Sequence, residues 1–239
     1  MLWRKVWWDT RGLFQFTLAW MILVCVFILG LGGKAGPADY QKMVWVLWFR
    51  LMMTSMWPIL ALFMGMTILR SIPLFDGPPG AAGLFTLSLP ITRRKIILSH
   101  WAVFVMEMTS ISLAQAPLIS IISSFNGRWF PMKDAILYSM FIGIGGMVFV
   151  SLSYLLIVIF KNNVWAILGP VVVVNILLHV PRWIIGEYAE YPWWNIFHVM
   201  SGESYFHHGK IPWLGLFASL AVSASMMLAA LRIYERRDF

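Results

Sequence analysis

Six long apolar runs follow one another along the chain, and shorter stretches between them hold most of the charged residues. Each run is long enough to cross a hydrocarbon core as a helix, which takes about 20 residues. The runs cover residues 13–33, 44–69, 96–122, 135–160, 164–185 and 211–233. The stretches between them are too short to fold as separate domains. The pattern therefore predicts one all-α integral membrane domain, residues 1–239, with six transmembrane helices.

The composition supports a membrane protein. Of the 239 residues, 60% are hydrophobic and only 12% are charged, which is far from the balance of a soluble domain. The net charge of +8 could indicate nucleic-acid binding, but the cations lie at the ends of apolar runs, where they set topology and meet headgroups. We therefore expect membrane lipids as partners and no nucleic acid. With Cys25 as the single cysteine, an intrachain disulfide is excluded.

The distribution of Lys and Arg predicts the orientation. With an even number of spans both termini lie on one side, and that side holds the tight basic clusters of the short loops. Under the positive-inside rule this side is cytoplasmic. The opening stretch "MLWRKVWWDTRG" is too long and too aromatic for the basic leader of a signal peptide, so we expect the first span to be retained.

The cytoplasmic loop between the second and third runs reads "RSIPLFDGPPGAAGLFTLSLPITRRK". "GPPG" breaks any helix that enters from the second run, and "AAGLFTLSL" is apolar enough for about two helical turns along the membrane or against another protein. Pro90 ends that piece, and Thr92 can cap the next helix. Arg93, Arg94 and Lys95 then hold the helix end at the headgroups. By spacing alone, a topology anchor explains this cluster.

The stretch "GLFTLSLPITRRKIIL", residues 83–98, resembles the "GT…LLSLPVSR…IL" stretch that follows the second span in permease subunits of ABC-2 type ABC transporters. The end of the chain, "AALRIYERRDF", is similar to the short basic aromatic tail of that family. The six-span plan covers essentially the whole chain and includes an amphipathic N-terminal segment: Trp3, Arg4, Lys5, Trp7 and Trp8. Asp76 and "PPGAAGLFT" only approximate the acidic residue and Thr that family members often have early in this loop.

The resemblance implies a cytoplasmic coupling helix that docks in a cleft of a separate ATP-binding subunit. The expected coupling residues are the apolar Leu84, Phe85 and Leu87, then Pro90, and the basic Arg93, Arg94 and Lys95, which would pair with acids of the partner. The chain has no G-x-x-x-x-G-K-[ST] loop. We therefore expect no cofactor in this chain and no catalysis by it, with ATP and Mg bound by the partner ATPase. The resemblance further implies an exporter in the bacterial inner membrane, built from two permease chains, expected as a homodimer, and two ATPases.

Polar residues inside the runs are candidates for a substrate path. Glu107 and Gln115 share a face of the third run, where they either line a route or pack against polar partners of a neighbouring helix. Asn175 and His179 share a face of the fifth run, where a pore role and an interhelical hydrogen bond are both open. By resemblance, the path forms where the second and fifth spans of two chains meet, which adds the second-run residues Met52, Met53, Met56, Trp57 and Phe63. Lipid-facing or core packing explains a Met-rich helix equally simply.

The external segment "GEYAEYPWWNIFHVMSGESYFHHGKIPW" allows two interpretations. As a metal site of a membrane-embedded metalloenzyme, it would use His198, Glu203, His207 and His208, although no H-E-x-x-H motif is present. As an interfacial cap, it would place Trp193, Trp194 and Phe197 at headgroup depth. ABC-2 permeases carry short re-entrant helices here that help close the outer gate, so the resemblance favours the cap and no metal. An accessory membrane scaffold is a third function class.

Overall fold

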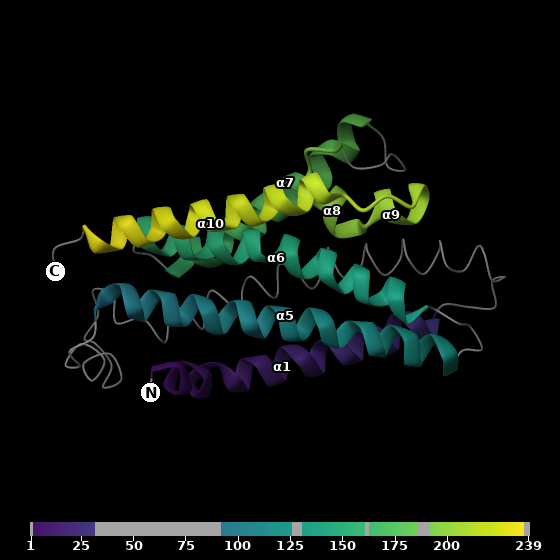
Figure 1. The fold of residues 1–239 in the computed structure, drawn as a ribbon, viewed down its shortest axis with the longest axis horizontal. Coiled ribbons are helices and arrows are strands. Elements are labelled where there is room, and N and C mark those ends of the chain that lie inside the picture. The colour runs from purple at the N-terminus through teal and green to yellow at the C-terminus, as the bar shows by residue number, and fades with distance from the viewer. Residues whose placement is uncertain (1, 32–91, 126–130, 161–162, 186–191, 237–239) are drawn as a thin grey trace.

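The computed structural model describes residues 2–31, 92–125, 131–160, 163–185 and 192–236, and these segments are helical throughout, with short turns between helices. In the labels of Figure 1, the helices are α1 (Leu2–Leu31), α5 (Arg93–Phe125), α6 (Met132–Phe160), α7 (Asn163–Ile185), α8 (Ile196–Ser201), α9 (Glu203–His208) and α10 (Trp213–Glu235). The prediction of an all-α fold is confirmed for these segments. The second run, with Met52 and Met56, and the loop residues Leu84, Phe85, Leu87 and Pro90 lie outside the described residues.

Within the described segments, three helices are long and apolar enough to cross a membrane: Ile97–Ile122 of α5, Met132–Phe160 and Trp213–Glu235. Shorter apolar stretches lie in α1 and α7, at Phe14–Leu23 and Leu168–Pro181. The boundaries of α5, α6, α7 and α10 agree with the predicted runs to within a few residues. The described part of the chain is therefore helical, and α5, α6 and α10 contain stretches that fit a bilayer.

α1 includes the expected amphipathic N-terminal segment. It is one continuous helix that begins at Leu2. The Thr10 hydroxyl lies 3.1 Å from the carbonyl oxygen of Val6, and the Arg11 guanidinium stacks 3.7 Å from the ring centroid of Trp8. These contacts, one helical turn apart, support the helix through its polar first third. The amphipathic stretch and the first apolar run therefore form a single element.

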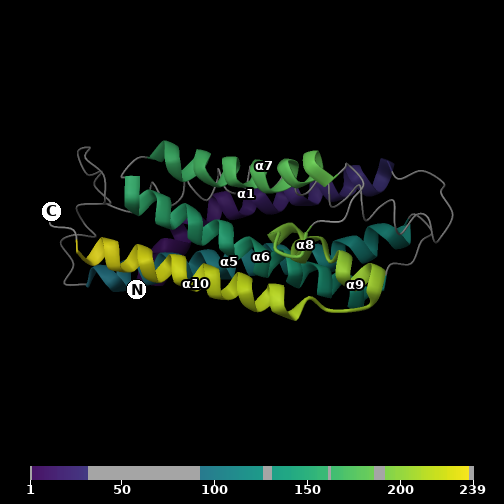
Figure 2. The same cartoon turned by 90° about the horizontal axis from the view of Figure 1, so that it is seen from above.

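α6 is the central helix of the bundle. It packs against α5 on one side and α10 on another, and it also contacts α7 and α8, while α1 packs against α5 (Figures 1 and 2). Close approach depends on small residues: Ser151 of α6 and Ser223 of α10 bond through their hydroxyls at 2.6 Å, and a Cβ at Gly143 would lie 3.3 Å from Ser112 of α5. Small side chains and interhelical hydrogen bonds are how helices associate within a membrane.

Candidate functional site

The basic cluster predicted to face an ATPase lies in the first turn of α5. Arg94 and Lys95 are exposed, and the Lys95 amide donates to the Thr92 carbonyl at 2.9 Å, which closes the first turn. That turn contains no acidic residue. Positive charge is unfavourable at a helix N-terminus, because the macrodipole is positive there. Helix stability therefore does not explain the cluster, and its charges are free to meet anions outside the described part of the chain.

Glu107 lies in the contact between α5 and α1. It is 6% exposed, and its carboxylate oxygen Oε1 accepts a hydrogen bond from the Thr10 hydroxyl. Gln115, two turns further along α5, is also buried. Glu107 thus has the polar partner on a neighbouring helix that one of the two interpretations expected. Thr10 itself was missed in the sequence, because it lies in the stretch expected to precede the first span.

Asn175 and His179 lie on an exposed face of α7. The Asn175 side-chain amide donates to the carbonyl of Val171 at 2.8 Å, so this hydrogen bond is within α7 and not between helices. α7 packs against α6 and α8, whereas Glu107 faces α1. The structure therefore does not bring Glu107 together with Asn175 and His179, and a path that uses all three stays a prediction.

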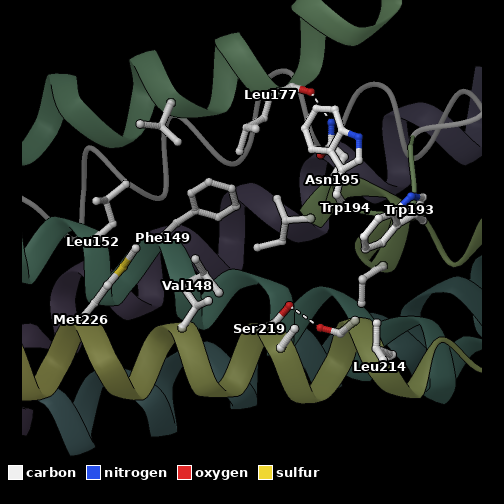
Figure 3. A pocket seen from close by; sticks show the side chains of 16 residues that line it. Val148, Phe149, Leu152, Leu177, Trp193, Trp194, Asn195, Leu214, Ser219 and Met226 are labelled. Atoms are coloured by element: carbon white, nitrogen blue, oxygen red, sulfur yellow. Dashed lines mark hydrogen bonds between the residues drawn. The ribbon is translucent and has the colours of Figure 1, made fainter.

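Asn195 fastens the start of α8 to α7. Its side chain is 1% exposed; Oδ1 accepts from the Phe197 amide at 2.9 Å, and Nδ2 donates to the Leu177 carbonyl at 2.7 Å (Figure 3). Pro181 stands four residues after Leu177 inside α7, and because proline has no N–H it cannot donate to that carbonyl. The proline thus leaves an acceptor in the helix, and Asn195 satisfies it.

Two glycines form the seat of α8. A Cβ at Gly145 of α6 would overlap Met200, and a Cβ at Gly215 of α10 would overlap Val199. The Phe197 ring, with no exposed surface, stacks on Phe149 of α6 at a centroid distance of 6.0 Å. The side chains of α8 therefore fill space that exists only because two neighbouring helices carry no side chain there.

α9 is held against the start of α6. The Tyr205 hydroxyl donates to Asp134 Oδ1 at 3.0 Å, and its ring meets Phe141 edge-on at 6.3 Å. The hydrogen bond to the Asp134 carboxylate raises the pKa of Tyr205. Gly202 and Gly209 adopt left-handed φ values of 64° and 67°, which end α8 and α9 and favour glycine. Together, α8 and α9 form a compact cap, here called the α8–α9 cap.

The three predicted gate residues fall in two environments. Phe197 is fully buried, whereas Trp193 and Trp194 are 75% and 60% exposed. Both indoles line a groove of about 400 Å³ between α6, α7 and α10, here called the apolar groove (Figure 3). Phe197 therefore fixes α8 to the core, while the two tryptophans stand at the mouth of a cavity.

The His-rich part of the segment predicted to be external shows no metal geometry where the structure describes it. Within the described ranges, no group of three His, Cys, Asp or Glu side chains lies close enough to hold a metal ion. His198 is half-buried in α8, and His208 is exposed at the end of α9. The side chains of Glu203 and His207 fall outside the description.

Comparison with known proteins gives no assignment. No family model, no curated protein and no solved structure matches the chain. Its function therefore has to be argued from its own residues and their arrangement.

Proposed function

We propose that this chain is the membrane-spanning permease subunit of an ATP-driven exporter, working as a homodimer with two separate ATP-binding subunits. In this proposal six spans cross a bacterial inner membrane, with both termini in the cytoplasm. The observation that carries the proposal is the exposed basic cluster in the first turn of α5, directly after the loop that resembles the coupling segment of ABC-2 permeases. That position is unfavourable for α5 alone and suits a partner with acidic residues.

The ends of the helices support this orientation. Trp213 and Arg232 of α10 are nineteen positions apart, about 28 Å of helix, which is close to the ~30 Å thickness of a hydrocarbon core. The start of α5 and the end of α10 lie at the same end of the bundle, and the α8–α9 cap lies towards the other (Figures 1 and 2). Arg94, Lys95 and Arg232 thus gather at one end, as the positive-inside rule requires of a cytoplasmic face.

α5 is suited to transmit a movement from that face. It is one helix of 33 residues, about 50 Å long, packed against α1 and α6. A push on its first turn would displace the part of the helix before Pro117, and α6, which packs against α5, also contacts α8 and α10. Pro117 interrupts the hydrogen bonding of α5 in its second half and provides a point at which the helix can bend. ATP-driven closure of a partner would thereby reach the α8–α9 cap.

The test is purification of the tagged chain from its native membranes together with an ATP-binding partner, followed by reconstitution of the complex into vesicles. Replacing Leu84, Phe85 and Leu87 with Ala should leave membrane insertion intact and abolish the link between ATP hydrolysis and transport. A cluster that only anchors the helix would tolerate this change and fail when Arg93, Arg94 and Lys95 are neutralised. ATP hydrolysis by the isolated chain would contradict the proposal, and one bound zinc ion per chain would favour a metalloenzyme.

A further inference from the structure

The apolar groove has a floor on α6 and walls on two helices that do not join above it. Phe149 and Leu152 form part of the floor, Leu177 belongs to the α7 wall, and Val222 and Met226 to the α10 wall (Figure 3). Its volume of about 400 Å³ lies in the range of small-molecule pockets. A cavity of this kind accepts one slender apolar group.

The polar side chains in the lining already bond to the backbone. Asn195 bonds to Leu177 and Phe197, as described above, and the Ser219 hydroxyl donates to the Gly215 carbonyl at 2.8 Å. Apart from the indoles of Trp193 and Trp194 at its mouth, the remaining lining of the groove is hydrocarbon, glycine and thioether. A ligand that needed hydrogen bonds within the groove would lose those it makes in water, so the groove selects an apolar one.

The length of the groove matches one half of a bilayer. Leu214 and Met226, which line its two ends on α10, are twelve residues apart, about 18 Å of helix. One leaflet contributes half of the ~30 Å hydrocarbon core, roughly 15 Å. A chain that enters the groove at Leu214 therefore ends near the bilayer midplane when it reaches Met226.

The two ends of the groove differ in polarity. Trp193 and Trp194, with their exposed indoles, stand at the Leu214 end, whereas the Met226 end is lined by Leu152 and other apolar side chains (Figure 3). Indoles are characteristic of headgroup depth, where the N–H can donate to ester or phosphate oxygens. The groove therefore has hydrogen-bond donors at one end and hydrocarbon at the other, which complements the acceptor oxygens and the acyl chain of a lipid molecule.

Exposed apolar side chains stand at or next to lining residues on both walls of the groove. Ile176 of α7 is 51% exposed, Phe217 of α10 is 66% exposed, and Val222 is 43% exposed. Apolar side chains exposed along both helices make the hydrocarbon of the membrane, and not water, the phase from which a ligand would enter.

We propose that the apolar groove binds one acyl chain of a phospholipid from the leaflet on the side of the α8–α9 cap, with the headgroup oxygens accepting hydrogen bonds from Trp193 and Trp194. This site does not depend on the proposed export function. Because bilayer hydrocarbon is as apolar as the groove, the lipid is held by close packing and by the indole hydrogen bonds, not by the hydrophobic effect.

The test uses phosphatidylethanolamine with a photoactivatable diazirine near the end of one acyl chain, at low mole fraction in phosphatidylethanolamine–phosphatidylglycerol vesicles that contain the whole protein. After illumination, peptide mapping should place the label on Leu152 and Met226. Ala218→Phe and Val222→Trp, each at an exposed lining position, should lower this labelling at least fivefold. Ala221→Phe, exposed on the same helix outside the groove, should leave it within twofold.

A second arm tests the headgroup contact by native mass spectrometry of the extracted protein. Trp193→Phe with Trp194→Phe keeps the rings and removes both N–H donors, so the fraction of chains with one bound phospholipid should fall at least threefold. Trp213→Phe, at an exposed indole outside the groove, should not change it. Equal labelling by the lipid probe on all faces of α10 would mean that the helix contacts bulk lipid only. Protein cross-links from groove residues to residues 44–69 or to a second copy of the chain would mean that protein occupies the groove. Either result overturns the site.

Discussion

The two ends of the helical bundle are built on opposite principles. At one end, α5 begins with exposed cations that oppose its dipole, and no acidic residue in that turn compensates them. At the other end, Asn195, two glycines and the bond between Tyr205 and Asp134 hold the α8–α9 cap by contacts within the chain. The cap is therefore held by contacts within the described residues, whereas the cations at the start of α5 are exposed and have no acidic residue in their own turn.

The largest stability effect should come from Asn195. Asn195→Ala leaves the buried Phe197 amide and the Leu177 carbonyl without their partners, and each such loss costs about 1–3 kcal/mol. Pro181→Ala restores an N–H that can bond to Leu177 within α7, so Asn195→Ala should be less damaging in that background. Unfolding of the four variants in mixed micelles measures this double-mutant cycle. Additive effects would show that Pro181 and Asn195 are not linked.

The seat of α8 should come next. Gly215→Ala forces Val199 aside, and overpacking of this kind costs roughly 1–3 kcal/mol. Gly145→Ala should cost less, because Met200 is flexible and Val199 is β-branched.

Gly12→Ala is the matched control for the seat. Nothing lies within 4 Å of the Cβ that it adds, so this change should stabilise α1 by up to about 1 kcal/mol. Thermal unfolding in detergent compares the three variants. A loss of stability in Gly12→Ala equal to that in Gly215→Ala would contradict the seat.

A smaller effect is expected at the outer edge of the cap. The neutral Tyr205 hydroxyl donates to Asp134, and this bond raises its pKa above the ordinary value of 10.0. The contribution of the bond is therefore complete below pH 10 and is lost as the pH rises through the raised pKa.

Spectrophotometric titration against Tyr205→Phe isolates this tyrosine from the other six. Asp134→Asn should move the ionisation of Tyr205 to lower pH, because the amide carries no charge. Identical titration curves in the two backgrounds would mean that α9 is not held by this bond.

The smallest effect should have the opposite sign. Arg94→Gln and Lys95→Gln remove cations from a helix N-terminus, so each should stabilise the isolated chain by about 0.3–1 kcal/mol. Repeating the unfolding measurement at high salt should shrink the gain, because exposed charges are screened. Destabilisation by either change would mean that the cluster has a partner within the chain.

The sequence predicted the helices better than their contacts. The boundaries of α6 and α10 follow from local hydrophobic runs, which a sequence displays directly. The first apolar run was predicted from Leu13 after an amphipathic segment, and α1 is helical from Leu2, because "WRKVWWDTRG" contains no proline to stop a helix.

The contacts that hold the α8–α9 cap could not be predicted from the sequence. Because Pro181 has no N–H, the carbonyl of Leu177 needs another donor, but no pattern in the neighbouring sequence identifies that donor as Asn195, eighteen residues away. The need for glycine at positions 145 and 215 likewise becomes visible only in the structure, where α8 packs against both residues. Aromatic composition grouped Phe197 with Trp193 and Trp194, while packing places it in the core. Contacts between distant segments decide these positions, and spacing along the chain does not encode them.

The central claim, that the basic end of α5 engages an ATPase, is tested by measuring ATP hydrolysis in the complex purified from native membranes in mild detergent. The wild-type chain and Lys210→Glu, a charge reversal after α9 at the cap end, should both co-purify with ATPase activity. With the double variant Arg94→Glu and Lys95→Glu, the co-purified ATPase activity should be at least tenfold lower, although the variant still inserts into the membrane. No activity with the wild type, or equal activity in all three preparations, would contradict the account.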